Sequence, residues 1–153
     1  MKVQTGPVQS GRSLIASLNL EPHPEGGWYR RTWVADSEGG ERPIGSAIIY
    51  LLLEGERSAP HRIDATELWH FYAGDPLELR REWTDGSVDV QVMGPDVEAG
   101  QMPQVVVPPG VWQSARPLGG YALVGATVVP AFTFEGFELR RANDETFTDP
   151  HEK

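Results

Sequence analysis

The sequence contains no cysteine among its 153 residues. This absence excludes a disulfide-stapled scaffold, a zinc or iron–sulfur site held by thiolates, and a thiol nucleophile. No stretch approaches the ~18 consecutive apolar residues of a membrane span, and the first residues show no apolar segment of the kind found in a secretory leader. We therefore expect a soluble, cytoplasmic protein that does not associate with membranes.

Basic residues are scarce as well: 13 Lys and Arg stand against 22 Asp and Glu, for a formal net charge of −9. Because binding to a phosphate backbone needs a basic face that displaces counterions, we expect no nucleic-acid partner. The apolar residues, 39% of the chain, are enough to bury a core. We expect a single domain over residues 1–153, with its core at about 14–140 and a polar tail at 142–153.

Glycine (17 residues) and proline (13 residues) are spread along the chain and separate short segments of strand-forming residues. The predicted strands are Trp28–Val34, Ile44–Leu53, Ser58–Ile63, Glu67–Ala73, Leu77–Trp83, Val88–Met93, Gln104–Val107, Trp112–Ala115, Tyr121–Val129 and Phe132–Arg140. About ten short strands joined by tight turns predict an all-β protein, a double-sheet jelly roll.

Two segments depart from simple alternation of apolar and polar residues. Segment 44–53 is apolar at both alternating sets of positions, which predicts a strand covered on both faces. Segment 10–20 has Leu14, Ile15 and Leu18 at helical spacing, with Ser10 or Ser13 as a cap. We therefore expect a short N-terminal helix packed on one side of the domain.

The stretch GERSAPHRIDATELWHFYAG resembles the first motif of the cupin superfamily, which is Gly, five residues, His-x-His, three or four residues, Glu, six residues, Gly. Gly55, His61, Glu67 and Gly74 fall at these spacings, and Ile63 takes the place of the second histidine.

The stretch VVVPPGVWQSA resembles the second cupin motif, Pro-x-Gly, two residues, His. Pro108 and Gly110 match, whereas Gln113 takes the place of the histidine and Pro117 that of a trailing asparagine. Two of the usual four metal ligands, three His and one Glu, therefore remain.

At a finer level the chain is similar to a family of small single-domain cupins known as a domain of unknown function. The similarity rests on HPEGGWYRRTW, the HR…ELWHFYAGDPL segment, GQMPQVVVPPGVWQSA and YALVGATVVPAFTFEGFEL. It implies a double-stranded β-helix, the cupin jelly-roll barrel, which is commonly a homodimer and holds a small-molecule pocket. No substrate follows from the similarity.

Alternation along the strands predicts which side chains meet inside the barrel. His61 and Ile63 share one face of their strand, and Glu67, Trp69 and Phe71 share one face of the next. If both faces point inward, an imidazole and a carboxylate meet in a mostly apolar cavity of the kind that binds ligands. Three side chains near the motifs complete the expected ligand-binding set: Gln113, Trp28 and Trp112.

Three roles of the polar residues stay open. His61 and Glu67 could bind one divalent metal ion, with Gln113 as a weak third ligand through its amide oxygen. Without a metal, a desolvated Glu67 with a raised pKa could act as a general base or acid beside His61. In the third interpretation these side chains satisfy one another inside a barrel that is not catalytic.

Other histidines and arginines are weaker candidates. Odd spacing from Glu67 places His70 on the opposite face unless a bulge intervenes. His23 and Glu25 lie in a proline-rich loop that could cross the barrel mouth, where a turn-stabilising role is favoured over ligand contact. Of each arginine pair, such as Arg30 and Arg31, one member lands on the outer face, and an inward arginine would indicate an anionic substrate.

These observations favour an enzyme that isomerises or epimerises a small oxygenated substrate, sugar-like or ketoacid-like, with Glu67 and His61 as catalytic residues. The alternatives are a non-catalytic small-molecule binding dimer and a metal-dependent oxygenase, which the replacements at Ile63 and Gln113 disfavour. A homodimer is expected because segment 28–34 is too aromatic to leave in water.

Overall fold

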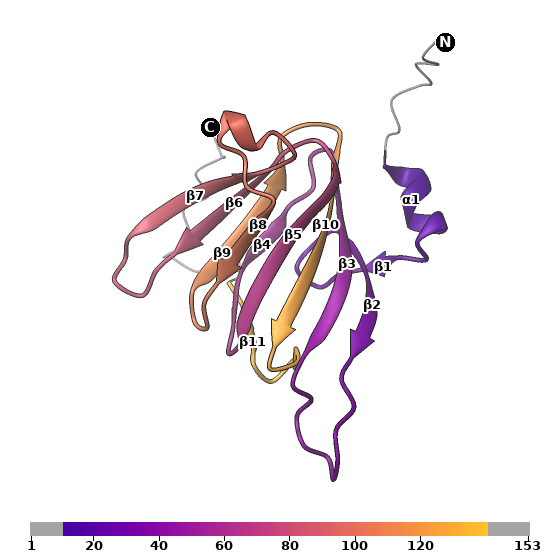
Figure 1. The fold of residues 1–153 in the computed structure, drawn as a ribbon, viewed down its shortest axis with the longest axis vertical. Helices are drawn as coiled ribbons and strands as arrows, with labels where there is room; N and C mark the ends of the chain where they lie inside the picture. Colours follow the sequence, from indigo (N-terminus) through magenta and orange to yellow (C-terminus); the bar gives the residue numbers. More distant parts are fainter. Residues whose placement is uncertain (1–10, 141–153) are drawn as a thin grey trace.

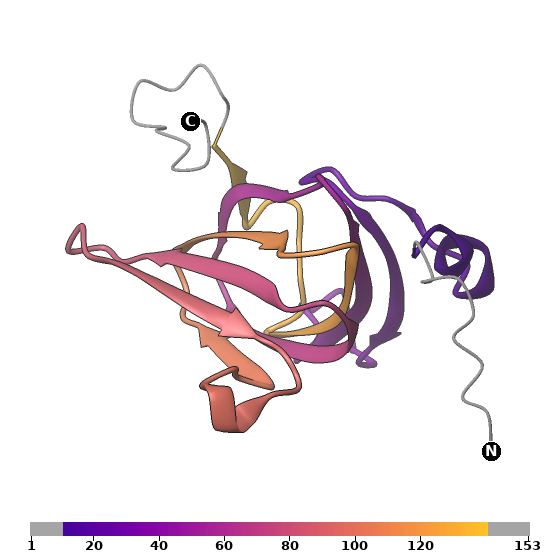
Figure 2. The same ribbon diagram turned by 90° about the horizontal axis from the view of Figure 1, so that it is seen from above.

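Two antiparallel sheets curve around a common interior in the computed structural model, which describes residues 11–140 (Figures 1 and 2). The first sheet contains, in spatial order, β1 (Glu21–Pro22), β2 (Trp28–Val34), β3 (Ser46–Leu53), β10 (Tyr121–Val129), β5 (Thr66–Gly74) and β8 (Gln104–Val107). The second contains β11 (Phe137–Leu139), β4 (Ser58–Ile63), β9 (Trp112–Pro117), β6 (Leu77–Glu82) and β7 (Val88–Met93). The predicted all-β jelly roll is confirmed; the polar tail at 142–153 lies outside the described residues.

Strand β3 is covered on both faces, as its sequence predicted. Tyr50 and Leu52 lie in the core between the sheets, while Leu51 and Leu53 pack beneath the short helix α1 (Arg12–Ser17). Figure 2 shows this helix outside the barrel, beside the strands nearest the N-terminus. No helix within residues 11–140 has the length and apolar character needed to cross a membrane.

The helix is shorter than predicted, and Ser13 lies within it instead of capping it. Its N-cap is Gly11, whose φ of 79° is left-handed and which has no side chain to form a capping hydrogen bond. A Cβ at this position would lie 2.8 Å from the Cβ of Tyr121 and 2.9 Å from Leu53. Close contact with the sheet, rather than capping, therefore determines where the helix begins; Ser10 lies outside the described residues.

The second difference concerns the last predicted strand, because only Phe137–Leu139 pairs as β11. The preceding segment bonds to the β2–β3 loop instead. The Arg42 Nε–H donates to the carbonyl of Ala131 at 2.8 Å, and the Ala131 N–H donates to the carbonyl of Pro43 at 3.0 Å. Phe132 N–H donates to Ser46 Oγ at 3.0 Å. These bonds hold residues 131–136 across one end of the barrel. Two short elements, β1 and the 3₁₀ turn Val97–Ala99, were not predicted.

A β-bulge determines which side chains of β4 face the interior. Ser58 pairs with Ala115 and His61 with Gln113, so three steps along β4 match two along β9. The bulge breaks the alternation, and Ser58, His61 and Ile63 are consequently all buried. His61 is thereby placed beside Gln113, as the two motifs predicted.

The loop between β1 and β2 lies directly against the start of β4. Ala59 N–H donates to the carbonyl of Glu25 at 2.8 Å, and Gly26 has a φ of 111°. A Cβ at Gly26 would lie 2.1 Å from the carbonyl oxygen of Arg57. Glycine is therefore required here for the loop to approach the strand.

We expect Gly26→Ala to destabilise the protein more than Gly39→Ala, a matched change at a second glycine with positive φ (60°). Nothing lies within 4 Å of a Cβ at Gly39, so that variant reports the backbone strain alone. The excess loss at Gly26 should be about 2 kcal/mol or more in the free energy of unfolding, measured by urea denaturation. Equal losses would show that the loop withdraws from β4 without penalty.

Candidate functional site

A cavity of about 40 Å³ lies between the two sheets and is lined by residues of β2, β3, β4, β5, β10 and two loops. Its polar lining consists of His23, Glu25, Tyr29, Arg31, Ser46, His61 and Glu67. Its apolar lining consists of Ala47, Ile48, Ile63, Ala126, Val128, Phe132 and Phe134. The lining is thus half apolar and half polar, and several acid–base groups converge on one small space.

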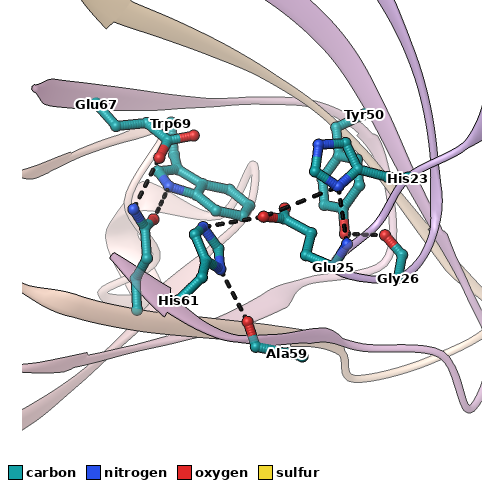
Figure 3. A network of polar contacts seen from close by, with 9 residues as sticks. His23, Glu25, Gly26, Tyr50, Ala59, His61, Glu67 and Trp69 are labelled. Atoms are coloured by element: carbon teal, nitrogen blue, oxygen red, sulfur yellow. Dashed lines mark hydrogen bonds and ion pairs between the residues drawn. The ribbon is translucent and has the colours of Figure 1, made fainter. Parts of the chain in front are cut away.

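His61 is almost fully buried, and both of its ring nitrogens have partners. Nδ1 lies 2.8 Å from the carbonyl oxygen of Ala59, which can only accept, so Nδ1 carries the proton. Nε2 lies 3.1 Å from Oε2 of Glu25 (Figure 3). The backbone at the bulge therefore selects the tautomer and turns the lone pair of Nε2 toward a carboxyl group.

Glu25 and His61 form a pair that is neutral at pH 7. Burial raises the pKa of Glu25 to about 8, so the carboxyl group keeps its proton. Burial also lowers the pKa of His61, against the opposing influence of Glu67 and of the hydrogen bond to Ala59. The protonated Glu25 thus donates to Nε2 of His61, and the pair holds a transferable proton beside the cavity.

His23 supports the same loop and is neutral. Its Nδ1 accepts a hydrogen bond from Glu25 N–H at 3.1 Å. Burial lowers the pKa of His23 to about 4, with a further contribution from His61. Its ring contacts Tyr29 and Tyr50 edge-on at centroid distances of 4.6 and 5.6 Å. Tyr50 in turn donates to the carbonyl of Gly26, which holds the loop in place.

A chain of hydrogen bonds orients Glu67 on β5. Trp69 Nε1–H donates to Oε1 of Gln113 at 2.7 Å, and Nε2 of Gln113 donates to Oε2 of Glu67 at 2.7 Å (Figure 3). Since an indole N–H can only donate, the amide oxygen of Gln113 must face Trp69, and its NH₂ group must face Glu67.

The carboxyl group of Glu67 is balanced between its two protonation states near neutral pH, in agreement with the predicted raised pKa. Burial raises this pKa to about 7, and nearby Glu25 adds to the rise. His61 and the amide of Gln113 act in the opposite direction because both stabilise the carboxylate. A group with this pKa can both accept and donate a proton under physiological conditions.

Protein partners already engage two members of the predicted metal site of His61, Glu67 and Gln113. The oxygen of Gln113 accepts from Trp69 with one of its two lone pairs, and its NH₂ faces Glu67. Nε2 of His61 is paired with Glu25. Within residues 11–140, no group of three or more His, Cys, Asp or Glu side chains is arranged to hold a metal ion. A metal at His61, Glu67 and Gln113 would have to displace Glu25 from His61, and this ligand set stays a prediction.

Three of the predicted ligand-binding aromatic residues lie away from the cavity. Phe71 packs in the core between the sheets. Trp28 packs with the residues beneath α1, and its Nε1–H donates to Glu56 at 3.3 Å. Trp112 faces outward, with the guanidinium carbons of two arginines 4.7 and 4.1 Å from its ring centroid. Alternation explains the last case, because the neighbouring Gln113 is the inward residue of β9.

The remaining predicted residues lie where alternation places them. Ile63 lines the cavity, whereas buried Trp69 and Gln113 do not; they connect to it only through the hydrogen bond of Gln113 to Glu67. His70 points to the outer face of the first sheet, where its Nε2 lies 3.1 Å from Thr127 Oγ1 and its ring stacks on Tyr72.

Sequence reasoning undervalued Glu25 and missed Tyr50. Glu25 was assigned a turn-stabilising role, yet it is the partner of His61 from a loop 36 positions earlier in the chain. Tyr50 is fully buried in an otherwise aliphatic segment. A hydroxyl within such a strand was a usable signal, because it must find a buried acceptor.

The fold and the cavity define a cupin: a double-stranded β-helix whose His61 and Glu67 occupy motif positions inside the barrel. Residues 12–140 match the family described as Cupin superfamily (DUF985), and the chain belongs to this family. No curated protein matches the chain significantly.

Solved structures agree with this assignment. A protein from Shewanella oneidensis is 37% identical, with a TM-score of 0.82, and the match covers 87% of this chain and 85% of that one. A hypothetical protein from Leishmania major is 30% identical, with a TM-score of 0.77 and coverages of 84% and 86%. Oxalate decarboxylase from Bacillus subtilis, also studied for its Mn(II) centres, is 13% identical with a TM-score of 0.61. The match covers 77% of this chain and 29% of that one, and shows the fold alone.

The two buried carboxyl groups predict that stability falls as pH rises. Their pKa values are raised from 4.5 to about 8 for Glu25 and about 7 for Glu67, so their stabilisation is complete below about pH 4.5 and is lost through pH 7 and 8. His23 and His61 have lowered pKa values and act oppositely, but only below about 6.5. Between pH 6.5 and 8.5 we expect the free energy of unfolding to fall by about 2–3 kcal/mol.

Urea denaturation at each pH measures this fall. The matched control is the double variant Glu25→Gln with Glu67→Gln, whose stability should vary little over the same pH interval. A flat profile for the unmodified protein would show that both carboxyl groups titrate as they do in water.

With one histidine, one glutamate and one amide in place of the usual three histidines and one glutamate, His61, Glu67 and Gln113 are also expected to bind metal only weakly. Ile63→His combined with Gln113→His places imidazoles where the cupin motifs carry histidine, and we expect this variant to bind Mn²⁺ or Zn²⁺ at least about tenfold more tightly than the unmodified protein. Calorimetric titration of protein purified without an affinity tag measures the difference.

Adding His61→Ala to this variant should remove the gain, whereas adding His70→Ala should preserve it. Tight, stoichiometric binding by the unmodified protein that His61→Ala abolishes would reinstate the original ligand set.

Proposed function

We propose that the protein is an enzyme that isomerises or epimerises a small oxygenated molecule by moving a proton within the cavity. One observation carries this proposal: two separate acid–base groups, Glu67 and the pair of Glu25 with His61, line the same small cavity. Proton-shifting enzymes need one group that removes a proton from carbon and another that manages the charge developing on oxygen.

Glu67 is proposed as the group that removes and returns the proton. Its Oε2 is held by Gln113, and within the described residues no hydrogen bond occupies Oε1. With a pKa of about 7, the ionised form is populated at neutral pH and the protonated form is readily regenerated. The amide of Gln113 orients the carboxylate without taking up a proton.

The pair of Glu25 with His61 is proposed as the second acid–base group. With a 2-hydroxy carbonyl substrate, Glu67 takes a proton from the hydroxyl-bearing carbon while Glu25 delivers its own proton to the carbonyl oxygen, which gives a neutral enediol. Glu67 then returns its proton to the neighbouring carbon, or to the other face of the same carbon, while the ionised Glu25 takes a proton from an enediol hydroxyl group. These transfers restore both carboxyl groups and complete an isomerisation or epimerisation. His61, neutral and fixed by Ala59, accepts the hydrogen bond of protonated Glu25 through Nε2 and so orients this carboxyl group.

The alternatives differ in what they require of the same residues. A metal-dependent oxygenase requires a ligand set that the engaged atoms of His61 and Gln113 do not offer. A non-catalytic binding protein would use the cavity without using the protons of Glu25 and Glu67, and burying two carboxyl groups without use or charge pairing is costly. Proton transfer therefore accounts for the site better.

A homodimer and a cytoplasmic location remain predictions. The dimer was predicted because segment 28–34 is aromatic, but Trp28 and Tyr29 pack within the protomer. Of the aromatic residues of β2, only Trp33, which is 49% exposed, still supports the dimer.

We expect Glu67→Gln to lower turnover by about 10²-fold or more while ligand affinity stays within severalfold, because the amide keeps the shape but cannot shuttle a proton. Ligands are first found by thermal shift, since binding to the folded state raises the melting temperature. Hits are then tested for incorporation of solvent deuterium at an acidic carbon, detected by mass spectrometry.

The control is Glu54→Gln, which alters an exposed carboxyl group at the end of β3 and should leave turnover unchanged. Deuterium incorporation that persists undiminished in Glu67→Gln would remove Glu67 from the mechanism. Tight binding of a ligand without any turnover would favour the non-catalytic binding protein.

A further inference from the structure

Strand β2 directs one of two adjacent arginines into the cavity. Tyr29 pairs with Tyr50 and Arg31 with Ile48, and both partners belong to the inward face of β3. Arg31 accordingly lines the cavity from its solvent-exposed edge, whereas Arg30, which is also exposed, is not among its lining residues. A bulge follows directly after Arg31, so this is the last position of β2 whose alternation is set by the inner face.

The guanidinium of Arg31 has no acidic partner within residues 11–140. No hydrogen bond or ion pair of its side chain occurs among the described residues. Six other arginines each form an ion pair with an Asp or Glu side chain: Arg42, Arg62, Arg80, Arg81, Arg116 and Arg140. An unpaired guanidinium at the edge of a cavity is a free binding group for a planar anion.

The charge of the cavity favours an anion with a single negative charge. Arg31 is the one Lys or Arg among the described residues that line it. His23 and His61 are neutral because burial lowers both pKa values. Glu25 keeps its proton at pH 7 and donates it to His61, so it carries no charge that would repel an anion. Glu67, with a pKa of about 7, is ionised in part of the molecules at neutral pH and adds no positive charge. The single positive charge of Arg31 can therefore pair with a carboxylate but cannot balance a phosphate dianion.

We propose that Arg31 binds the carboxylate of a short 2-oxo or 2-hydroxy acid and is thus the residue that determines substrate class. The proposal rests on the proposed function, because the oxygen next to that carboxylate is the one that the acid–base groups would serve. Ile63, Val128, Phe132 and Phe134 supply an apolar wall for a short hydrocarbon chain. The small volume of the cavity limits that chain to a few carbon atoms.

The recognition step depends on geometry as well as charge. A guanidinium offers two parallel N–H groups to the two oxygens of a carboxylate, so it fixes the plane of the acid as well as its position. An uncharged sugar would leave Arg31 unused, and a phosphate would leave a negative charge uncompensated. These two ligand types are the competing outcomes of the experiment.

The probes are pyruvate, lactate, glycolate and 2-oxobutyrate, with pyruvamide and lactamide as uncharged analogues and inorganic phosphate as the dianion. Binding to the full chain is measured by calorimetry at fixed ionic strength. We expect at least one acid to bind more tightly than its amide and than phosphate. Arg31→Met should weaken binding of that acid by about tenfold or more and leave binding of the amide unchanged.

Two further variants guard against a general effect of the substitution. Arg30→Met removes the same charge from the adjacent position and should change affinity by less than about twofold, because Arg30 does not line the cavity and an exposed charge without a direct contact is screened by salt. Arg31→Lys keeps the charge but loses the two-pronged contact, and should recover only part of the affinity. Equal affinity of Arg31→Met and the unmodified protein would overturn the proposal, as would a panel in which no acid binds.

Deuterium incorporation separates this proposal from the proposed function. Acids that bind through Arg31 but exchange no hydrogen would leave the substrate class standing and remove the isomerase or epimerase activity. Hydrogen exchange on an uncharged substrate, at a rate that Arg31→Met does not change, would support the isomerase or epimerase activity and remove the proposed substrate class.

Discussion

The indole N–H of Trp69 can only donate a hydrogen bond, and this restriction fixes the orientation of the Gln113 amide beside it. The amide must then present its NH₂ group to Glu67, where it holds one carboxyl oxygen and favours the ionised form. The same orientation leaves the amide oxygen with one lone pair already used by Trp69. A buried tryptophan, itself part of the core, thus sets the orientation of the group that holds Glu67.

Much of the fold could be predicted from the sequence, because short apolar segments separated by glycine and proline have few ways to bury their side chains. The double coverage of β3 followed from its apolar residues at both alternating sets of positions, and α1 provides that coverage. The inward positions of His61, Ile63 and Glu67 followed from motif spacing, and the structure places all three at the cavity. The short β11 could not be foreseen, since the bonds that hold residues 131–136 come from a loop far away in sequence.

The candidate site was only half predictable for a related reason. Alternation describes residues on one strand, whereas the partner of His61 is Glu25, which arrives from a loop that requires Gly26 to approach β4. The orientation of Gln113 depends on a tryptophan 44 positions away. Trp28 and Trp112 were assigned to the cavity because they adjoin its motifs in sequence, but adjacent residues on a strand face opposite sides.

Strands β2 and β5 occupy unequal places in the sheet. Strand β5, which carries Glu67, lies between the nine-residue β10 and the four-residue β8, whereas β2, which carries Arg31, is flanked on one side by the two-residue β1. A change at Arg31 disturbs no core packing and breaks no ion pair, while a change on β5 disturbs two neighbours. Under the proposed function, ligand preference would change most readily on a strand that tolerates replacement, while the proposed reacting group Glu67 lies on one that does not. This division allows a single barrel to give rise to proteins that share a chemical step and differ in what they accept.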